Sequence, residues 1–327
     1  MVTQISNIKS QKRDIAGLIK GLHHITATVN DAQEDYDFYA KGLGLRLVKE
    51  TVNFDNEKVY HFYYANKIGS PSTVFTTFPY KGQGVRNGII GAGQATHNAF
   101  SVPVSSIDFW KARLKKFGIA FNQETMFDMS VLEFKDPSGL QIQIVSSAND
   151  EREPVWEYDD IGKAEAIRGL HHAFLLVTEK EPVHDFLEAF GYAQKKEEGN
   201  MRLYEAGAGG AGNMLVVKTD LNAGRGINGL GTVHHVAHRV DSVDDSLKIK
   251  AYIQSEWNLQ VTDVLDRKYF RSIYFRIPGG VLFEVATSGP GFLVDETAED
   301  LGKKLKLPDW QEPNRERIEA NLLPYQK

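Results

Sequence analysis

The sequence predicts an α+β fold built from four copies of one βαβββ module. Four short strand-like segments each begin with a His-His or His-Asn pair, and each is followed by a helical stretch and further strand-like segments. These pairs hold seven of the ten histidines in the 327-residue chain, which random placement would not produce. A unit that recurs at this spacing indicates a repeated supersecondary structure.

The first strand of each module contains the histidine pair, and the first helix follows it. The second members of the four pairs are His24, Asn98, His172 and His235. The helices are predicted from apolar residues at helical spacing, and the first three stop at a glycine, as helix C-termini often do. The predicted helices span residues 31–42, 105–117, 181–190 and 244–257.

Three strands follow the helix in each module, and the last two of them are placed by runs of β-branched and aromatic residues. The third strands are predicted at residues 59–64, 131–134, 202–205 and 273–276. The final strands are predicted at 73–78, 140–145, 213–218 and 281–286, and turn signals rich in Pro and Gly precede three of them. The modules group as an N-terminal domain at 1–150, a C-terminal domain at 167–292 and a tail at 293–327.

Composition excludes several classes of protein. A net charge of −5 gives no overall attraction to nucleic acid or to an anionic membrane. No run of 18 apolar residues exists, and residues 1–17 lack the apolar segment of a secretion signal, so we expect a cytoplasmic protein. The absence of cysteine excludes disulfides, thiolate metal sites and cysteine nucleophiles. Any metal must therefore be held by histidine, carboxylate or other oxygen ligands.

The repeat itself suggests where such a metal would lie. Because alternate side chains of a strand face the same side, His24 and His235 should lie on one face of equivalent strands. Counting six residues from each turn proline gives Thr77, Gln143 and Glu284, of which only Glu284 is a carboxylate. Two imidazoles and one carboxylate suit a non-haem Fe(II) oxygenase, and catalytic zinc takes the same set.

Alternatives remain at this point. Each histidine could be an ordinary structural residue, although Glu284 in an apolar strand would be costly to bury without a partner. Either His24 or His172 could complete a site with His235 and Glu284. Aligning the third strands places His61 level with Tyr274, which favours pairing modules one and four, because a histidine and a tyrosine would then lie beside the metal.

The residues also carry a family resemblance. The sequence resembles the vicinal oxygen chelate superfamily, which includes extradiol dioxygenases and glyoxalase I. Within it, the sequence looks like the bacterial ring-cleaving dioxygenases linked to hydroquinone and quinone resistance and like the hydroquinone dioxygenases of chlorophenol degradation. The resemblance covers nearly all of the chain after residue 20. It rests on Gly21-Leu-His-His-Ile-Thr26, Thr51-Val-Asn-Phe-Asp55, Tyr60-His61, Gly231-Thr-Val-His-His235, Asp266-Arg267, Ile273-Tyr-Phe-Arg276, Phe283-Glu284 and Asn321-Leu-Leu-Pro324.

This resemblance implies a fold of paired curved mixed sheets and an iron site formed by the first and last modules. It implies Fe(II), with Mn(II) as the alternative, held by His24, His235 and Glu284. It also implies that an aromatic diol and O₂ bind there and that quinone detoxification is the role. Net charge and the lack of an apolar span, as above, argue against nucleic acid and a membrane as partners, and a homo-oligomer stays open. The residues implied to act near the substrate are Thr26, His234, Arg267 and Tyr274, to which the strand alignment adds His61.

Two points do not fit simple expectation. His172 is a departure from the family pattern, and strict alternation points His234 away from His235. The rival functions are a glyoxalase-like lyase, which ordinarily needs a second carboxylate where Thr77 stands, and a metal-free binding protein of the same fold. We expect Asn98, Gln143 and His172 to form the matching cup of modules two and three, which should hold no tightly bound metal.

Overall fold

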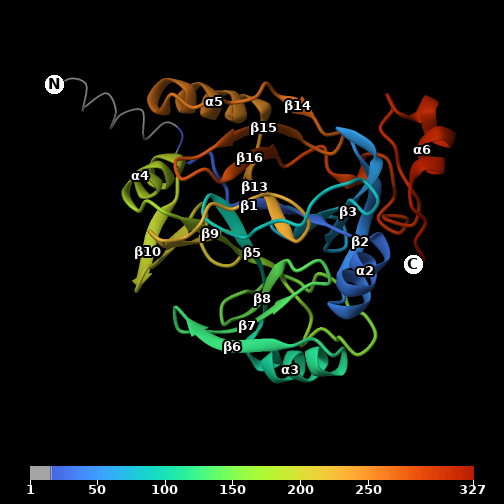
Figure 1. Cartoon of the computed structure of the whole chain (residues 1–327), viewed down its shortest axis with the longest axis horizontal. Helices are drawn as coiled ribbons and strands as arrows, with labels where there is room; N and C mark the ends of the chain where they lie inside the picture. Colours follow the sequence, from blue (N-terminus) through green and yellow to red (C-terminus); the bar gives the residue numbers. More distant parts are fainter. Residues whose placement is uncertain (1–14, 16) are drawn as a thin grey trace.

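The computed structural model describes residue 15 and residues 17–327. We predicted that residues 1–17 hold no secretion signal, and this segment lies largely outside the described residues. Within them, the predicted α+β class and the four βαβββ modules are confirmed. The chain forms two mixed eight-stranded sheets, each curled into a half-barrel (Figure 1).

Each module has its strands and helix close to the predicted positions. Module one comprises β1 (Leu22–Val29), α2 (Ala32–Tyr36), a π-helical turn (Asp37–Gly42), β2 (Arg46–Asn53), β3 (Asn56–Ala65) and β4 (Val74–Pro79). Module two comprises β5 (Gln94–Pro103), α3 (Ile107–Lys116), β6 (Phe121–Met126), β7 (Met129–Lys135) and β8 (Gln141–Ser147).

The second half of the chain repeats this order. Module three comprises β9 (Gly169–Val177), α4 (Glu181–Phe190), β10 (Ala193–Glu198), β11 (Met201–Glu205) and β12 (Met214–Thr219). Module four comprises β13 (Thr232–Val240), α5 (Val243–Trp257), β14 (Leu265–Asp266), β15 (Arg271–Arg276) and β16 (Leu282–Thr287). The tail carries α6 (Arg315–Asn321), and its Ile318 and Leu322 pack with Val52 of β2.

The sheets join modules that are distant in the sequence. The first sheet has the order β14-β15-β16-β13-β1-β4-β3-β2 and so combines modules four and one. The second sheet, with the order β10-β11-β12-β9-β5-β8-β7-β6, combines modules three and two. Each sheet thus takes one module from each half of the sequence. The division of the chain into domains at residues 1–150 and 167–292 remains a prediction.

One hydrophobic core holds the two sheets together. Strand residues from both sheets, such as Ile25 and Phe100, share it with helix residues such as Trp110 and Phe186. The opposite face of each sheet lines the inside of its half-barrel, where a separate cluster of buried residues lies. We call the inside of the first half-barrel the first cup and that of the second half-barrel the second cup.

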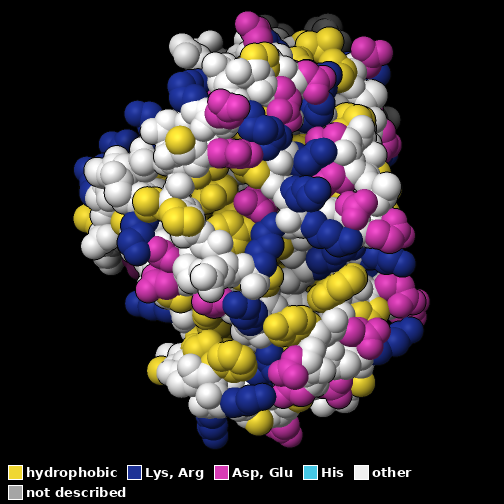
Figure 2. Space-filling model, turned by 90° about the vertical axis from the view of Figure 1, so that its right-hand side faces the viewer, with side chains coloured by type: hydrophobic (Ala, Val, Ile, Leu, Met, Phe, Trp, Pro, Cys, Tyr) yellow, Lys and Arg dark blue, Asp and Glu magenta, His cyan; other side chains and the backbone are white. Residues whose placement is uncertain are grey.

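One face of the surface carries charges of both signs. On the face formed by the side of the molecule with α2, α6 and the tail, acidic and basic side chains are interspersed (Figure 2). No helix in the part of the chain that the structure describes is long and apolar enough to cross a membrane.

Candidate active site

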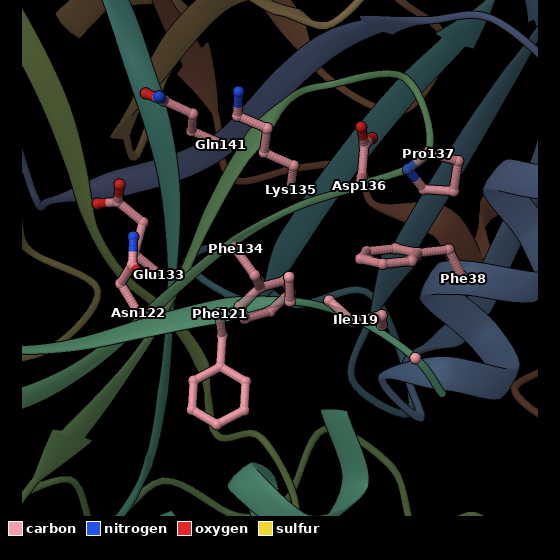
Figure 3. Close-up of a pocket in the computed structure, with 12 residues that line it drawn as sticks. Phe38, Ile119, Phe121, Asn122, Glu133, Phe134, Lys135, Asp136, Pro137 and Gln141 are labelled. Atoms are coloured by element: carbon pink, nitrogen blue, oxygen red, sulfur yellow. The ribbon is translucent and has the colours of Figure 1, made fainter. Parts of the chain in front are cut away.

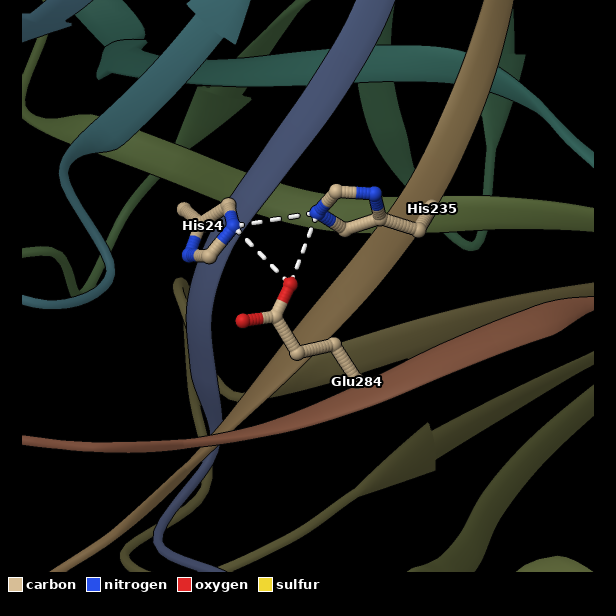
Figure 4. A group of neighbouring side chains, drawn as sticks. All are labelled: His24, His235 and Glu284. Carbon is tan, nitrogen blue, oxygen red and sulfur yellow. Dashed lines mark hydrogen bonds and ion pairs between the residues drawn. The ribbon is translucent and has the colours of Figure 1, made fainter. Parts of the chain in front are cut away.

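Three buried side chains of the first cup converge on one point (Figure 4). His24 Nε2 lies 3.2 Å from His235 Nε2 and 3.3 Å from Glu284 Oε2, and His235 Nε2 lies 2.8 Å from the same oxygen. Among the described residues, this is the one group of three or more His, Cys, Asp or Glu side chains whose ligand atoms all lie within 4.8 Å of one another. The structure therefore brings His24, rather than His172, beside His235 and Glu284.

The strand register explains this convergence. His24 on β1 pairs with Ala237 on β13, and Ala237 pairs in turn with Glu284 on β16. Side chains in register on neighbouring strands face the same side of a sheet, as do residues two apart on one strand, which adds His235. The methyl group of Ala237 leaves the space above it free, so the three longer side chains can meet there.

Two β-bulges set the direction of the neighbouring histidines. The register between β1 and β13 shifts twice. His23 is an extra residue of β1 without a partner on β13, and His234 is an extra residue of β13 without a partner on β1. Their side chains consequently turn toward the next residue. His23 Nδ1 lies 2.9 Å from His24 Nδ1, and His234 Nδ1 lies 2.8 Å from His235 Nδ1. Each pair shares one hydrogen bond, which orients the imidazole and leaves its Nε2 facing the cup.

The carboxylate of Glu284 is suited to a cation. Burial acts to raise the pKa of Glu284, but the two imidazoles outweigh it and hold that pKa well below its usual range. Burial also lowers the pKa of His235, which favours the neutral, metal-binding form of its ring. Glu284 Oε2 has no hydrogen-bond partner of acceptable geometry among the described residues. Two ring nitrogens and this oxygen thus fit a divalent metal ion.

A pocket of about 190 Å³ is lined by His24 and His235, while Glu284 is fully buried behind them. Tyr274 and Arg267 form one wall, where Arg267 Nε donates to Tyr274 Oη at 3.3 Å and Arg267 Nη1 lies 3.1 Å from Asp55 Oδ2. Burial is the main cause that raises the pKa of Tyr274, so its hydroxyl keeps its proton and can donate. The remaining lining residues, for which the sequence predicted no role, are Asn53, Phe54, Asp55, Tyr63, Phe78, Tyr80 and Phe270.

Of the other predicted site residues, His61 and His234 line the pocket directly. Burial lowers the pKa of both rings, that of His234 to about 3, so both are neutral at pH 7. Thr26 lies beneath them in a polar chain: its Oγ1 is 2.8 Å from Thr76 Oγ1, which is 2.9 Å from His61 Nε2.

Two predicted equivalences in module one are wrong by register. Glu284 pairs with Tyr274, whereas in module one Thr76 pairs with Tyr63. Thr76, not Thr77, therefore stands where Glu284 stands, because the first turn is one residue shorter after its proline. Thr77 faces the other side of the sheet and donates from Oγ1 to Asp35 at 2.8 Å.

For the same reason, His61 is not the counterpart of Tyr274. Tyr63 takes that place, and His61 lies two residues further along the same face. His61 nevertheless enters the pocket, because residues two apart on a strand point in the same direction.

The second cup differs from its predicted composition. Gln143 pairs with Ala99, as Glu284 pairs with Ala237, so the counterpart of His235 is His97 rather than Asn98. Asn98 takes the place of Val236 and is fully buried. His172 lies in this cup on β9, so the cup holds two histidines.

A separate hollow of about 490 Å³ lies at the edge of the second sheet (Figure 3). Its lining is largely apolar, from Phe38, Ile119, Phe121 and Phe134, with Lys135 and Asp136 among the polar groups. No histidine lines it among the described residues, so it lacks the imidazole ligands found in the first cup.

Known proteins resemble this chain over almost its full length. The model of the glyoxalase/bleomycin resistance protein/dioxygenase superfamily matches residues 21–144. MhqO of Bacillus subtilis, which is named as a ring-cleaving dioxygenase, is 43% identical over 307 residues, covering 94% of this chain and 96% of that protein. The chlorohydroquinone/hydroquinone 1,2-dioxygenase of Sphingobium indicum is 34% identical over 314 residues, with 93% and 95% covered.

A solved structure shows the same fold. The crystal structure of a Bacillus subtilis protein described as a dioxygenase has a TM-score of 0.89 at 42% identity, covering 94% of this chain and 98% of that one. The chain therefore belongs to the glyoxalase/bleomycin resistance/dioxygenase superfamily and has the vicinal oxygen chelate fold. Within that superfamily, relatives that it matches over its length are named as ring-cleaving dioxygenases or as a hydroquinone dioxygenase.

Proposed function

We propose that this protein is an Fe(II)-dependent ring-cleaving dioxygenase that acts on hydroquinone- or catechol-type aromatic diols. The observation that carries the proposal is the meeting of His24, His235 and Glu284, of which the two histidines line a small pocket. Two imidazoles and one carboxylate leave several metal positions open, which suits oxygenases more than structural sites. Fe(II), when bound there, would bring the diol and O₂ together and pass electrons from the ring to O₂.

The chain's own residues supply orientation and proton handling. Tyr274 and Arg267 lie on the pocket wall and can hold the diol by hydrogen bonds while stabilising negative charge that develops on its oxygen. His61 and His234 line the same pocket, and the hydrogen bond between His61 and Thr76 fixes the ring of His61. His61 is thus placed to accept a hydroxyl proton from the substrate.

The pocket also limits the substrate. Its volume of about 190 Å³ fits a single aromatic ring, and Phe78 and Phe270 provide flat apolar contacts beside the polar groups. A quinone-detoxifying role follows from this chemistry, because ring opening removes the diol that would otherwise oxidise to a quinone. A cytoplasmic location is part of the proposal, since a chain without cysteine needs no oxidising compartment.

The rival functions have less support. A glyoxalase-like lyase would need a second carboxylate near the metal, and Thr76 occupies the equivalent place in module one. A metal-free binding protein would leave the buried Oε2 of Glu284 without the cation that its surroundings suit.

The test is to load the full chain with Fe(II) without oxygen and then to measure O₂ uptake with a panel of hydroquinones and catechols. Uptake that depends on both Fe(II) and a diol is the expected result. No uptake with any diol at full metal loading would contradict the proposed reaction, and no metal binding would favour the binding protein.

A further inference from the structure

The second cup keeps much of the construction of the first. His97 and His172 stand where His235 and His24 stand in the first cup. A bulge again precedes each: Thr96 Oγ1 lies 2.8 Å from His97 Nδ1, and His171 Nδ1 lies 2.9 Å from His172 Nδ1. Both imidazoles are therefore held as in the first cup, although neither carries a role in the proposed reaction.

One substitution removes the metal position. Phe174 pairs with His97, as Thr26 pairs with His235, so a phenyl ring lies where the first cup has a hydroxyl. Its centroid is 4.7 Å from that of His97 and 6.2 Å from that of His172, so it fills the space beside both imidazoles. His97 and His172 belong to no close group of metal ligands among the described residues. The second cup is thus shaped for something other than a metal.

A cavity of about 430 Å³ opens on this cup, within the range of small-molecule sites. Glu133 stands where Tyr274 stands in the first cup and accepts from Gln143 Nε2 at 3.1 Å, while His97 Nε2 lies 3.3 Å from Glu133 Oε2. The other amide atom, Gln143 Oε1, is buried and has no hydrogen-bond partner among the described residues. A buried acceptor without a hydrogen bond costs free energy of folding, so a ligand that donates a hydrogen bond to Gln143 Oε1 would be bound favourably.

The rest of the lining favours an aromatic ring. Phe174 offers a ring face, and the thioethers of Met126 and Met201 are the kind of group that packs well on aromatic edges. The two carboxylates Glu124 and Glu133 against the single ammonium of Lys218 disfavour an anionic guest. The cavity therefore suits a neutral ring that carries O–H donors.

We propose that the second cup is a metal-free binding site for a small hydroxylated aromatic compound such as phenol or hydroquinone. A hydroxyl donates to Gln143 Oε1 or to the Glu133 carboxylate, and the ring lies against Phe174 and the two methionines. The site is separate from the metal centre, and it goes beyond the proposed reaction without depending on it.

The methionines allow a direct test. The sequence has five, and all except Met1 lie in the second cup: Met126, Met129, Met201 and Met214. Full-length protein labelled with ¹³C at the methionine methyl groups is titrated with hydroquinone in the absence of oxygen. The expected result is a saturable shift of the Met126 and Met201 methyl signals, caused by the nearby ring.

Variants and analogues sharpen the test. Gln143→Leu removes the side-chain amide and with it the acceptor Oε1, and should weaken binding roughly tenfold, as loss of one hydrogen bond does. Glu133→Gln, at a partly exposed position, is a second variant that removes the charge and should also weaken binding. Cyclohexane-1,4-diol lacks the ring and benzoate is anionic, so neither should shift the signals.

The inference is overturned if hydroquinone gives no saturable shift up to millimolar concentrations. It is also overturned if both variants bind as the unmodified protein does, or if cyclohexane-1,4-diol acts equally well. Gln143→Leu should retain full ring-cleavage activity, because it lies outside the first cup. Failure of the O₂-uptake test would leave the methyl shifts unchanged, so the two proposals fail independently.

Discussion

Ser272 on β15 donates a hydrogen bond from its Oγ to Oε1 of Glu284 on β16, and both side chains are fully buried. Glu284 thus has one oxygen fixed by a neighbouring strand while the other faces His24 and His235. Groups that orient a metal-binding carboxylate commonly affect metal affinity almost as strongly as the ligands themselves.

Removing this hydroxyl should weaken metal binding without unfolding the protein. For Ser272→Ala we predict a loss of roughly 10- to 100-fold in Fe(II) affinity, measured by anaerobic titration. Ser255→Ala, on the outer helix α5, is the matched control and should bind Fe(II) as the unmodified protein does. Equal affinity in both variants would show that Ser272 does not orient Glu284.

The three proposed ligands should be individually essential. His24→Ala, His235→Ala and Glu284→Ala should each lose iron and activity, because two remaining ligands hold the metal weakly. Glu284→Gln should be nearly as damaging, since it keeps the shape but removes the charge that balances Fe(II). Metal content per chain, measured after desalting, and O₂ uptake together report the effect.

His172→Ala is the control for this series. It should retain iron and ring cleavage, because His172 lies in the second cup and Phe174 occupies the space beside it. Loss of iron in His172→Ala together with retention of iron in His24→Ala would place the metal in the second cup and would contradict the proposed site.

Tyr274→Phe should separate metal binding from turnover. The ring of residue 274 packs edge-on against His235 with centroids 5.6 Å apart, and phenylalanine preserves that contact. Only the hydroxyl that Arg267 bonds would be lost, so iron should stay bound while kcat falls by about 10²-fold. A variant with normal kcat would remove Tyr274 from the catalytic residues.

Asp35 should give the fold a measurable pH dependence. It is buried beneath the first sheet and accepts from Tyr64 Oη and Thr77 Oγ1, each at 2.8 Å. Burial is the main cause that raises the pKa of Asp35 to about 8. Because the folded state then holds a proton that the unfolded state releases above about pH 4, stability should fall as the pH rises from 4 to 8.

Asp35→Asn removes this titration while keeping an oxygen that can accept both hydroxyls. The slope of the free energy of unfolding against pH should become less negative by on the order of one proton across that range. Urea unfolding at several pH values measures it, with exposed Asp108→Asn as the control. An unchanged slope in Asp35→Asn would mean that Asp35 ionises normally in the folded protein.

The sequence was enough to predict the modules, but not the register of every strand. The histidine pairs predict four units because they recur with the same helical and strand patterns. Bulges are not visible in that pattern, so His234 was expected to point away from His235, whereas the extra residue turns it into the pocket.

The remaining errors have the same origin. Counting six residues from each turn proline assumed that all the turns have the same length. The turn of module one is one residue shorter, so the count selected Thr77 instead of Thr76 as the counterpart of Glu284. Aligning the His97-Asn98 pair with the His-His pairs selected Asn98 instead of His97 as the counterpart of His235. An alanine follows two residues after both His97 and His235, and this shared spacing indicates the correct alignment. The contact of Ser272 with Glu284 could not be predicted, because it depends on how β15 pairs with β16 in the folded sheet.

In the proposed reaction, both atoms of O₂ enter an opened ring at the centre formed by His24, His235 and Glu284. Mass spectrometry of the product formed from hydroquinone under ¹⁸O₂ by the Fe(II)-loaded protein tests this step. The expected product is a ring-opened acid that carries two ¹⁸O atoms. A benzoquinone product, or an opened product without ¹⁸O, would contradict it.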